Sequence, residues 1–189
     1  AMTIARTLEL VPTNDGLRLV SLPVEEMNAI RGTRTQLGSK LLTGESEIVE
    51  AGLKGPTELI LEFKVSNGSQ FGLASQFGVK LLNDLGEEMV IGYEPSNNRF
   101  FTDRTNAGKS GFNEGFARSH YAPYQNTDNT VKMHLLIDVS SVELFAEDGR
   151  VVMTDIFFPN EDFSRLTVFA KNGSVKLDSG QLYDLVSIW

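Results

Sequence analysis

Apolar and polar side chains alternate in two stretches of this chain, and this alternation constrains the fold more than any other feature. In the first stretch, residues 58–65, every second side chain is apolar: Leu59, Leu61, Phe63 and Val65. Residues 131–139 repeat the pattern. A period of two is typical of a strand with one buried face. Further strands are predicted over residues 142–147, 151–156, 166–171, 175–177 and 182–189.

Dipeptides that favour positive φ punctuate these strands: Asn67-Gly68, Asp148-Gly149 and Asn172-Gly173. Asn-Gly and Asp-Gly are typical of short hairpin turns, which join antiparallel neighbours. No helical period of useful length competes, although residues 24–31 are predicted to form one short helical turn. Many short strands joined by turns predict an all-β fold, an antiparallel sandwich of two sheets.

The first part of the chain differs in texture from the rest. A hairpin is expected around Asp15-Gly16, and a polar passage follows at 32–44. We interpret residues 1–45 as an arm and linker that lead from a preceding domain, and residues 46–189 as the sandwich domain. Residues 103–130 are rich in Asn, Gly and Ser and hold most of the irregular loop. Loops of this length are often functional or form an interface.

Charge and composition exclude several classes of partner. With 17 basic and 25 acidic residues the net charge is −8, so the basic footprint that a nucleic acid or an anionic membrane requires is missing. No run of about 18 apolar residues predicts a membrane span. The chain has no cysteine and two histidines, His120 and His134, so we expect neither a metal site nor a cofactor.

One long motif carries a family resemblance. Residues 137–149 read Ile-Asp-Val-Ser-Ser-Val-Glu-Leu-Phe-Ala-Glu-Asp-Gly, and Thr154 and Phe157-Phe158-Pro159 follow. This succession resembles a signature of glycoside hydrolase family 32, which contains the invertases, inulinases and levanases. The family carries Asp-x-Ser-Ser-x-Glu-x-Phe on a strand, then an Asp-Gly turn, a Thr and a Phe-Pro pair.

Three further segments match the same family, in its order. Residues 101–105, Phe-Thr-Asp-Arg-Thr, are similar to the start of its Asp-Arg-Thr-x-Ser-Gly segment, although Asn106-Ala107 departs from the usual residues. His120 with Ala122-Pro123 resembles a His-x-Ala-Pro element. Residues 6–24 resemble the strand pair that follows the family's catalytic propeller, so the resemblance covers nearly the whole chain.

The resemblance implies the carboxy-terminal β-sandwich of the family, a concanavalin- or lectin-like jelly roll with an N-terminal arm. Its implied partner is a catalytic five-bladed propeller in the same protein, in an extracellular or periplasmic enzyme, and a homodimer is a further option. The family's catalytic motifs include an Asp-Pro pair and a Glu beside Cys. This chain has no Asp-Pro pair, no cysteine and a single tryptophan, Trp189. We therefore assign no catalytic residue, and catalysis belongs to the parent enzyme.

Two acidic residues of the signature have the spacing of a possible catalytic pair. Glu143 and Glu147 lie four apart on a predicted strand and would share a face. A solvated polar face, opposite the apolar side chains between them, explains this spacing without catalysis. Asp148 is expected to support the following turn. We therefore expect both glutamates to be exposed.

Asp103, Arg104 and His120 are the candidate sugar-binding residues. Adjacent strand residues point to opposite faces, so Asp103 and Arg104 should not pair with each other; either could bind sugar hydroxyls. The alternative for Arg104 is structural, tying the long loop to the sandwich through backbone carbonyls, and we favour it. His120, Tyr121 and Tyr124 are expected to form an aromatic cluster that either stacks on a sugar or anchors the loop.

Two functions follow from these residues and from the resemblance. The first is a non-catalytic sandwich domain that docks on and stabilises the catalytic domain of an enzyme hydrolysing β-fructofuranosidic bonds in levan, inulin or sucrose. The second is a carbohydrate-binding module for fructan oligosaccharides. The arm at residues 6–24 and the Phe157-Phe158 region are expected to expose apolar side chains, since consecutive strand residues cannot both face one core.

Overall fold

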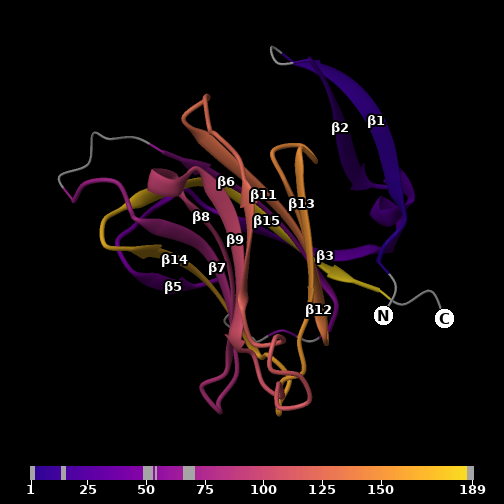
Figure 1. Ribbon diagram of the computed structural model, residues 1–189, viewed down its shortest axis with the longest axis vertical. Helices are drawn as coiled ribbons and strands as arrows, with labels where there is room; N and C mark the ends of the chain where they lie inside the picture. The colour runs from indigo at the N-terminus through magenta and orange to yellow at the C-terminus, as the bar shows by residue number, and fades with distance from the viewer. Residues whose placement is uncertain (1–2, 14–15, 49–52, 54, 66–70, 187–189) are drawn as a thin grey trace.

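The computed structural model describes residues 3–13, 16–48, 53, 55–65 and 71–186. In this part of the chain the fold is a sandwich of two antiparallel sheets with a separate hairpin beside it (Figure 1). One sheet has seven strands, in the order β13 (Val151–Ile156), β12 (Ser141–Ala146), β11 (Thr130–Asp138), β6 (Thr57–Lys64), β15 (Val175–Leu185) and β3 (Arg31–Leu37), with β4 (Lys40–Leu42) also paired to β15.

The second sheet has six strands. Its order is β10 (Ser119–Pro123), β9 (Arg99–Asn106), β8 (Glu88–Glu94), β7 (Gln76–Leu82), β14 (Arg165–Lys171) and β5 (Glu45–Glu47). Two 3-10 turns, Glu25–Ile30 and Pro95–Asn97, are the helical elements of the described residues. The first confirms the short helical turn predicted for residues 24–31, and the two sheets confirm the predicted all-β sandwich.

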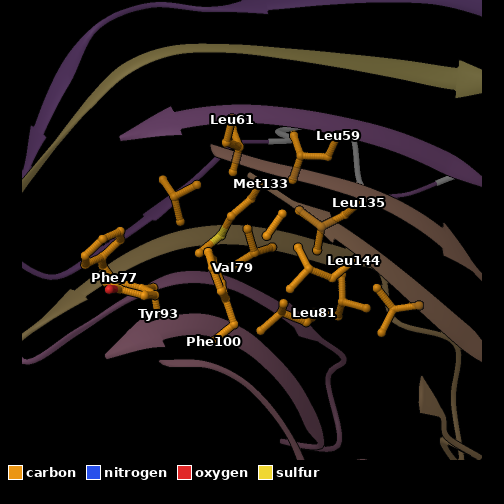
Figure 2. Close-up of a cluster of buried hydrophobic side chains, with 14 of the residues drawn as sticks. Leu59, Leu61, Phe77, Val79, Leu81, Tyr93, Phe100, Met133, Leu135 and Leu144 are labelled. Atoms are coloured by element: carbon orange, nitrogen blue, oxygen red, sulfur yellow. The ribbon is translucent and has the colours of Figure 1, made fainter. Parts of the chain in front are cut away.

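The core lies between the inner faces of the two sheets (Figure 2). From the seven-stranded sheet it receives the alternating apolar residues predicted from the sequence, among them Leu59, Leu61 and Phe63 of β6, which are at most 1% exposed. The six-stranded sheet contributes Phe77, Val79, Leu81, Ile91 and Tyr93. A chain of tilted rings, each 4.9–5.9 Å from the next between centroids, runs from Phe63 through Phe77, Tyr93 and Phe100 to Tyr124. Burial of this alternating face explains the sheets.

Two turns adopt the positive φ predicted from their dipeptides. Asp148 and Gly149 have φ of 55° and 81°, and Asn172 and Gly173 have 52° and 149°. Asn67-Gly68 lies outside the described residues. One prediction of separate strands was wrong: residues 175–177 and the segment from 182 belong to a single strand, β15, with a bulge between Leu177 and Ser179. Because a bulge shifts the register by one residue, the strand continues through the polar residues that follow Leu177 instead of ending there.

The N-terminal hairpin, β1 (Arg6–Thr13) and β2 (Gly16–Pro23), forms a two-stranded sheet of its own. It projects from the side of the sandwich near β13 (Figure 1). The polar passage at residues 32–44 contributes β3 and β4, both paired with β15. The backbone of β15 thus gains a partner on its second edge, which a strand in the middle of a sheet requires.

Candidate functional site

The hairpin is joined to the outer face of the seven-stranded sheet through Glu143. The Arg6 guanidinium donates to the carboxylate of Glu143 and, at 3.0 Å, to the hydroxyl of Thr154. The Ile4 backbone N–H donates to the other carboxylate oxygen at 2.9 Å, and the Arg6 guanidinium lies 5.0 Å from the centroid of the Phe145 ring. Glu143 is therefore a buried anchor of the hairpin.

The expectation that Glu143 and Glu147 are exposed was wrong, since each is only 6% exposed. Glu147 follows β12 at a φ of 53° and accepts hydrogen bonds from the Lys132 backbone N–H at 2.9 Å and the Tyr124 hydroxyl at 3.4 Å. Burial raises the pKa of Glu147, and the Lys132 N–H offsets this only in part. The sequence pattern does not reveal that the hairpin covers Glu143 or that the chain turns at Glu147. The contacts of both glutamates are structural.

Arg104 and His120 meet at the carboxylate of Asp155, which is buried on β13. The Nδ1 of His120 lies 2.8 Å from Asp155 Oδ1, and the nearest Arg104 nitrogen lies 3.4 Å from the same oxygen. Thr102 of β9 donates its hydroxyl to the other oxygen of Asp155. Because Asp155 belongs to the seven-stranded sheet and the others to the six-stranded sheet, this cluster links the two sheets at one edge of the sandwich.

Arg104 also ties the loop after β9 to the sandwich. Its guanidinium donates to the Phe116 carbonyl at 2.8 Å and to the Ile156 carbonyl at 3.1 Å, and it lies 3.9 Å from the centroid of the Phe116 ring. The structural role favoured for Arg104 is therefore present in the structure. Arg118 Nε donates to His120 Nε2 at 2.9 Å, so His120 donates its Nδ1–H to Asp155.

Asp103 of β9 lies on the opposite face of the six-stranded sheet from Arg104 and His120. It lines a hollow over the outer face of the six-stranded sheet together with Tyr121, and its Oδ1 accepts a hydrogen bond from the Thr105 backbone N–H at 2.9 Å. The structure thus brings two of the three candidate sugar-binding residues together and separates the third. Sugar binding by these residues stays a prediction.

The predicted aromatic cluster of His120, Tyr121 and Tyr124 was wrong. His120 binds Asp155, Tyr121 lies under the Arg99 guanidinium at 3.6 Å from its ring centroid, and Tyr124 packs on Phe100. Neighbouring residues of β10 point to opposite faces, because side chains alternate along a strand. Proximity in the sequence therefore does not bring the three rings together.

Two apolar surfaces match the expectation of exposed hydrophobic side chains. Phe157 is fully buried whereas Phe158 is 39% exposed. Phe158 stacks on Phe116 and meets Phe112 edge-on, beside a hollow of about 550 Å³. On the hairpin, four leucines are 57–70% exposed: Leu8, Leu10, Leu17 and Leu19. Leu10 pairs with Leu19 across the two strands, so these leucines form one continuous stripe.

A third surface was not predicted from the sequence; in it, two glycines of central strands lie side by side. Gly78 of β7 pairs with Gly92 of β8 beneath the hollow that Asp103 lines. The available signal was a glycine inside a strand pattern, which often marks a close approach of backbone or ligand. Within the described ranges, no group of three His, Cys, Asp or Glu side chains is arranged to hold a metal ion, and no helix there is long and apolar enough to cross a bilayer.

Together these features define the class: a two-sheet antiparallel β-sandwich with an accessory hairpin. The chain belongs to glycoside hydrolase family 32, since residues 26–184 match the model of the glycosyl hydrolases family 32 C terminal. This confirms the resemblance drawn from the sequence motifs. The matched part is the C-terminal domain of that family.

Known relatives match the whole chain with a fraction of their own length. A levanase of Bacillus subtilis is 36% identical over 191 residues, covering 100% of this chain and 28% of the relative. An extracellular exo-inulinase of Aspergillus awamori is 26% identical and is covered to 35%. The crystal structure of exo-inulinase from Aspergillus awamori superposes with a TM-score of 0.84 at 24% identity, over 99% of this chain and 36% of that chain. This likeness supports the fold, and the chain spans about a third or less of the relatives it matches.

Proposed function

We propose that this chain is the non-catalytic carboxy-terminal sandwich of an enzyme that hydrolyses β-fructofuranosidic bonds in levan, inulin or sucrose. Its role is to dock on the catalytic domain of the same protein and stabilise it. The observation that carries the proposal is the match of the whole chain to a small part of much longer levanases and an exo-inulinase. Such relatives leave room for a catalytic domain in the rest of the protein.

The hairpin stripe is the docking surface. Its four leucines expose large apolar areas on an element that is not covered by the sandwich, and exposed apolar patches mark interaction sites. The base of the hairpin is held in place by the Arg6–Glu143 ion pair and by a hydrogen bond from the Ser21 N–H to the Gly149 carbonyl at 3.0 Å. A surface that is held rigidly loses little entropy when it binds.

The predicted division into an arm at residues 1–45 and a sandwich at 46–189 stays a prediction, and within this proposal we move its boundary to the 3-10 turn, because β3 and β4 pair with β15 of the sandwich. The hairpin, with the 3-10 turn at Glu25–Ile30, is the connection to the catalytic domain, and β3 and β4 complete the sandwich sheet. Limited proteolysis tests the division. Cleavage between residues 24 and 30 that leaves a stable sandwich supports the hairpin as the separable arm.

Assays of catalysis and of docking test the main proposal. The 189-residue chain is expected to show no turnover of sucrose, inulin or levan, and appreciable turnover by it would overturn the non-catalytic role. Leu10→Ser with Leu19→Ser, placed in the full-length enzyme, is expected to lower its thermal stability and expose the hairpin to protease. Leu85→Ser, at a leucine that is 55% exposed on the sandwich, is the matched control and should change neither property.

Export of the parent enzyme completes this proposal. The relatives include an extracellular exo-inulinase of Aspergillus awamori, and polymeric fructans cannot enter a cell intact. We therefore place the parent in the extracellular or periplasmic space, and a homodimer remains part of the proposal. Fractionation of the producing cells with an activity assay on levan tests the location.

Fructan binding by the sandwich itself is the second candidate function. The observation in its favour is the polar hollow over the six-stranded sheet, with a volume of about 530 Å³, which lies within the range of small-molecule sites. Binding in this hollow is independent of docking through the hairpin, because the hairpin lies against the seven-stranded sheet.

A further inference from the structure

The hollow over the outer face of the six-stranded sheet, described above, is a trough that crosses all of the strands of that sheet. The lining residues come from β5, β7, β8, β9, β10 and β14. Six strands at a spacing of about 4.8 Å make the face roughly 24 Å wide. A ligand that fills such a trough is elongated, and a chain of several sugar units has this shape.

The floor of the trough is built from glycines and aromatic rings. Gly78 and Gly92 are paired at its centre, with Phe101 beside Gly92 and Phe169 beside Gly78. A Cβ added to Gly92 would lie 2.8 Å from the Phe101 ring, and one added to Gly78 would lie 2.1 Å from the Ile91 carbonyl oxygen. The glycines therefore allow a close approach of the neighbouring backbone, and the Phe101 ring lies over Gly92. Phe101 and Phe169 are only 5% and 4% exposed, so the rings form a closed, packed floor.

The charged groups along the trough hold one another in place. Lys80 Nζ lies 2.7 Å from Glu45 and 3.2 Å from Glu88. Glu94 accepts from Arg99 at 2.6 Å and from Gln76 at 2.5 Å. Glu94 is only 7% exposed and also accepts from Asn97 at 2.9 Å, so it holds Arg99 and Gln76 in place. Glu45 and Glu88 are ordered by Lys80 before a ligand binds, and their remaining lone pairs are available to hydroxyl groups.

The mixture of charges selects the chemistry of the ligand. Four carboxylates and two ammonium groups line the trough, those of Glu45, Glu88, Glu94, Asp103, Lys80 and Lys171. An anionic ligand such as a phosphorylated sugar would face a net negative surface. A neutral ligand rich in hydroxyl groups can both donate to the carboxylates and accept from the ammonium groups, so it matches the trough best.

We propose that this trough binds a neutral oligosaccharide, a stretch of fructan chain. The choice of fructan rests on the proposed function. Tyr121, 49% exposed at one end and fixed under the Arg99 guanidinium, supplies an apolar platform against a sugar ring. Asp103 and Ser119, paired across β9 and β10, supply acceptors and a hydroxyl to the sugar.

Isothermal titration of the 189-residue chain with levan and inulin oligosaccharides tests the proposal, with maltooligosaccharides and fructose 6-phosphate as comparison ligands. Binding of at least one fructan series, and of neither comparison ligand, is expected. Tyr121→Ala should raise the Kd at least fivefold, and Asp103→Asn at least threefold. Circular dichroism melting checks that each variant remains folded.

Two control variants match the tests. Phe112→Ala removes an exposed ring outside the trough, and Asp138→Asn changes a carboxylate that accepts a bond from a nearby backbone N–H, as Asp103 does. Both should leave the Kd unchanged. Flat heats with fructans at millimolar concentration, binding of maltooligosaccharides instead, or equal losses in the controls would overturn the proposal. None of these results bears on docking, which is measured through hairpin variants in the full-length enzyme.

Discussion

Buried carboxylates on the seven-stranded sheet are each held by specific donors. Glu58 accepts two hydrogen bonds from Arg31, at 2.5 and 2.7 Å, and lies 2.6 Å from His134 Nε2. Burial by itself would raise the pKa of Glu58, but the hydrogen bonds from Arg31 and His134 outweigh it and lower that pKa to about 2. Glu147 represents the opposite balance, since burial dominates there. Removing the charge of Glu58 should therefore destabilise the protein, whereas removing the charge of Glu147 should stabilise it.

Replacing Glu58 tests the first balance. Glu58→Gln is expected to lower the free energy of unfolding by about 2 kcal/mol at pH 7, because the half-buried Arg31 and His134 lose the carboxylate that they bind. A folded pKa below the unfolded value of 4.5 contributes stability that is present above pH 4.5 and is lost as the pH falls toward 2. Urea unfolding from pH 7 to pH 3 should show that the difference in unfolding free energy between the wild type and Glu58→Gln narrows below pH 4.5. A constant difference would contradict this account.

Replacing Glu147 should have the opposite sign. A raised pKa means that the folded state disfavours the ionised carboxylate, so Glu147→Gln is expected to stabilise the protein at pH 7 by about 0.5–1 kcal/mol. The gain should disappear as the pH falls through the raised pKa, where Glu147 becomes protonated. Glutamine retains an oxygen for the Lys132 N–H. Thermal melts at pH 7 and pH 4, with the exposed Glu114→Gln as control, measure the effect, and destabilisation at pH 7 would refute it.

At the scale of elements, the Asp-Gly turn of the family signature is in direct contact with the hairpin. Gly149 has a φ of 81°, and a Cβ there would lie 2.5 Å from the Ser21 carbonyl oxygen. The turn therefore requires glycine both for its backbone conformation and for the close approach of β2. Together with the Arg6–Glu143 ion pair, this contact fixes the hairpin to the sandwich.

Loss of Arg6 should release the hairpin without unfolding the sandwich. Arg6→Leu is expected to cost about 2 kcal/mol, because the buried Glu143 loses its cation, and to speed hydrogen exchange in residues 6–23. Adding Glu143→Gln should recover most of the stability but not the protection of the hairpin. Arg34→Leu, at an arginine bonded to Gln36 on β3, is the control. Unchanged exchange in Arg6→Leu would show that Arg6 does not hold the hairpin.

At the scale of the whole molecule, β15 closes the fold. It pairs with β6 on one side and with β3 and β4 on the other, so segments from both ends of the described chain meet in one sheet. The hairpin, in contrast, forms its own sheet and contributes little to the core. The two ends of the chain should therefore differ in what their removal does.

Two terminal truncations test this asymmetry. A chain ending at residue 174 lacks β15 and is expected to remain unfolded, because β3, β4 and β6 lose their common partner. A chain starting at residue 24 lacks the hairpin and should still unfold in one cooperative transition, at lower stability since Glu143 loses Arg6. Circular dichroism and amide dispersion in NMR spectra measure both. Cooperative unfolding of the chain that ends at 174 would contradict the prediction.

The sequence by itself determined the local structure and the family. The alternation in residues 58–65 and 131–139 identified the buried faces of β6 and β11, since a strand's period of two is set by its own backbone. The Asp148-Gly149 turn could be predicted because Asp and Gly tolerate the positive φ that a short hairpin turn requires. The signature at residues 137–149 was sufficient to identify glycoside hydrolase family 32, which the family model then confirmed.

Only the tertiary structure decided which side chains meet. Glu143 is buried because Arg6 reaches it from 137 positions away, and Arg104 meets His120 because both face Asp155 on the other sheet. Asp103 faces the trough, whose floor is made by Gly78 and Gly92 on neighbouring strands. A strand's pattern states which face is apolar, but the partner of a polar side chain is set by the register and packing of strands distant in sequence.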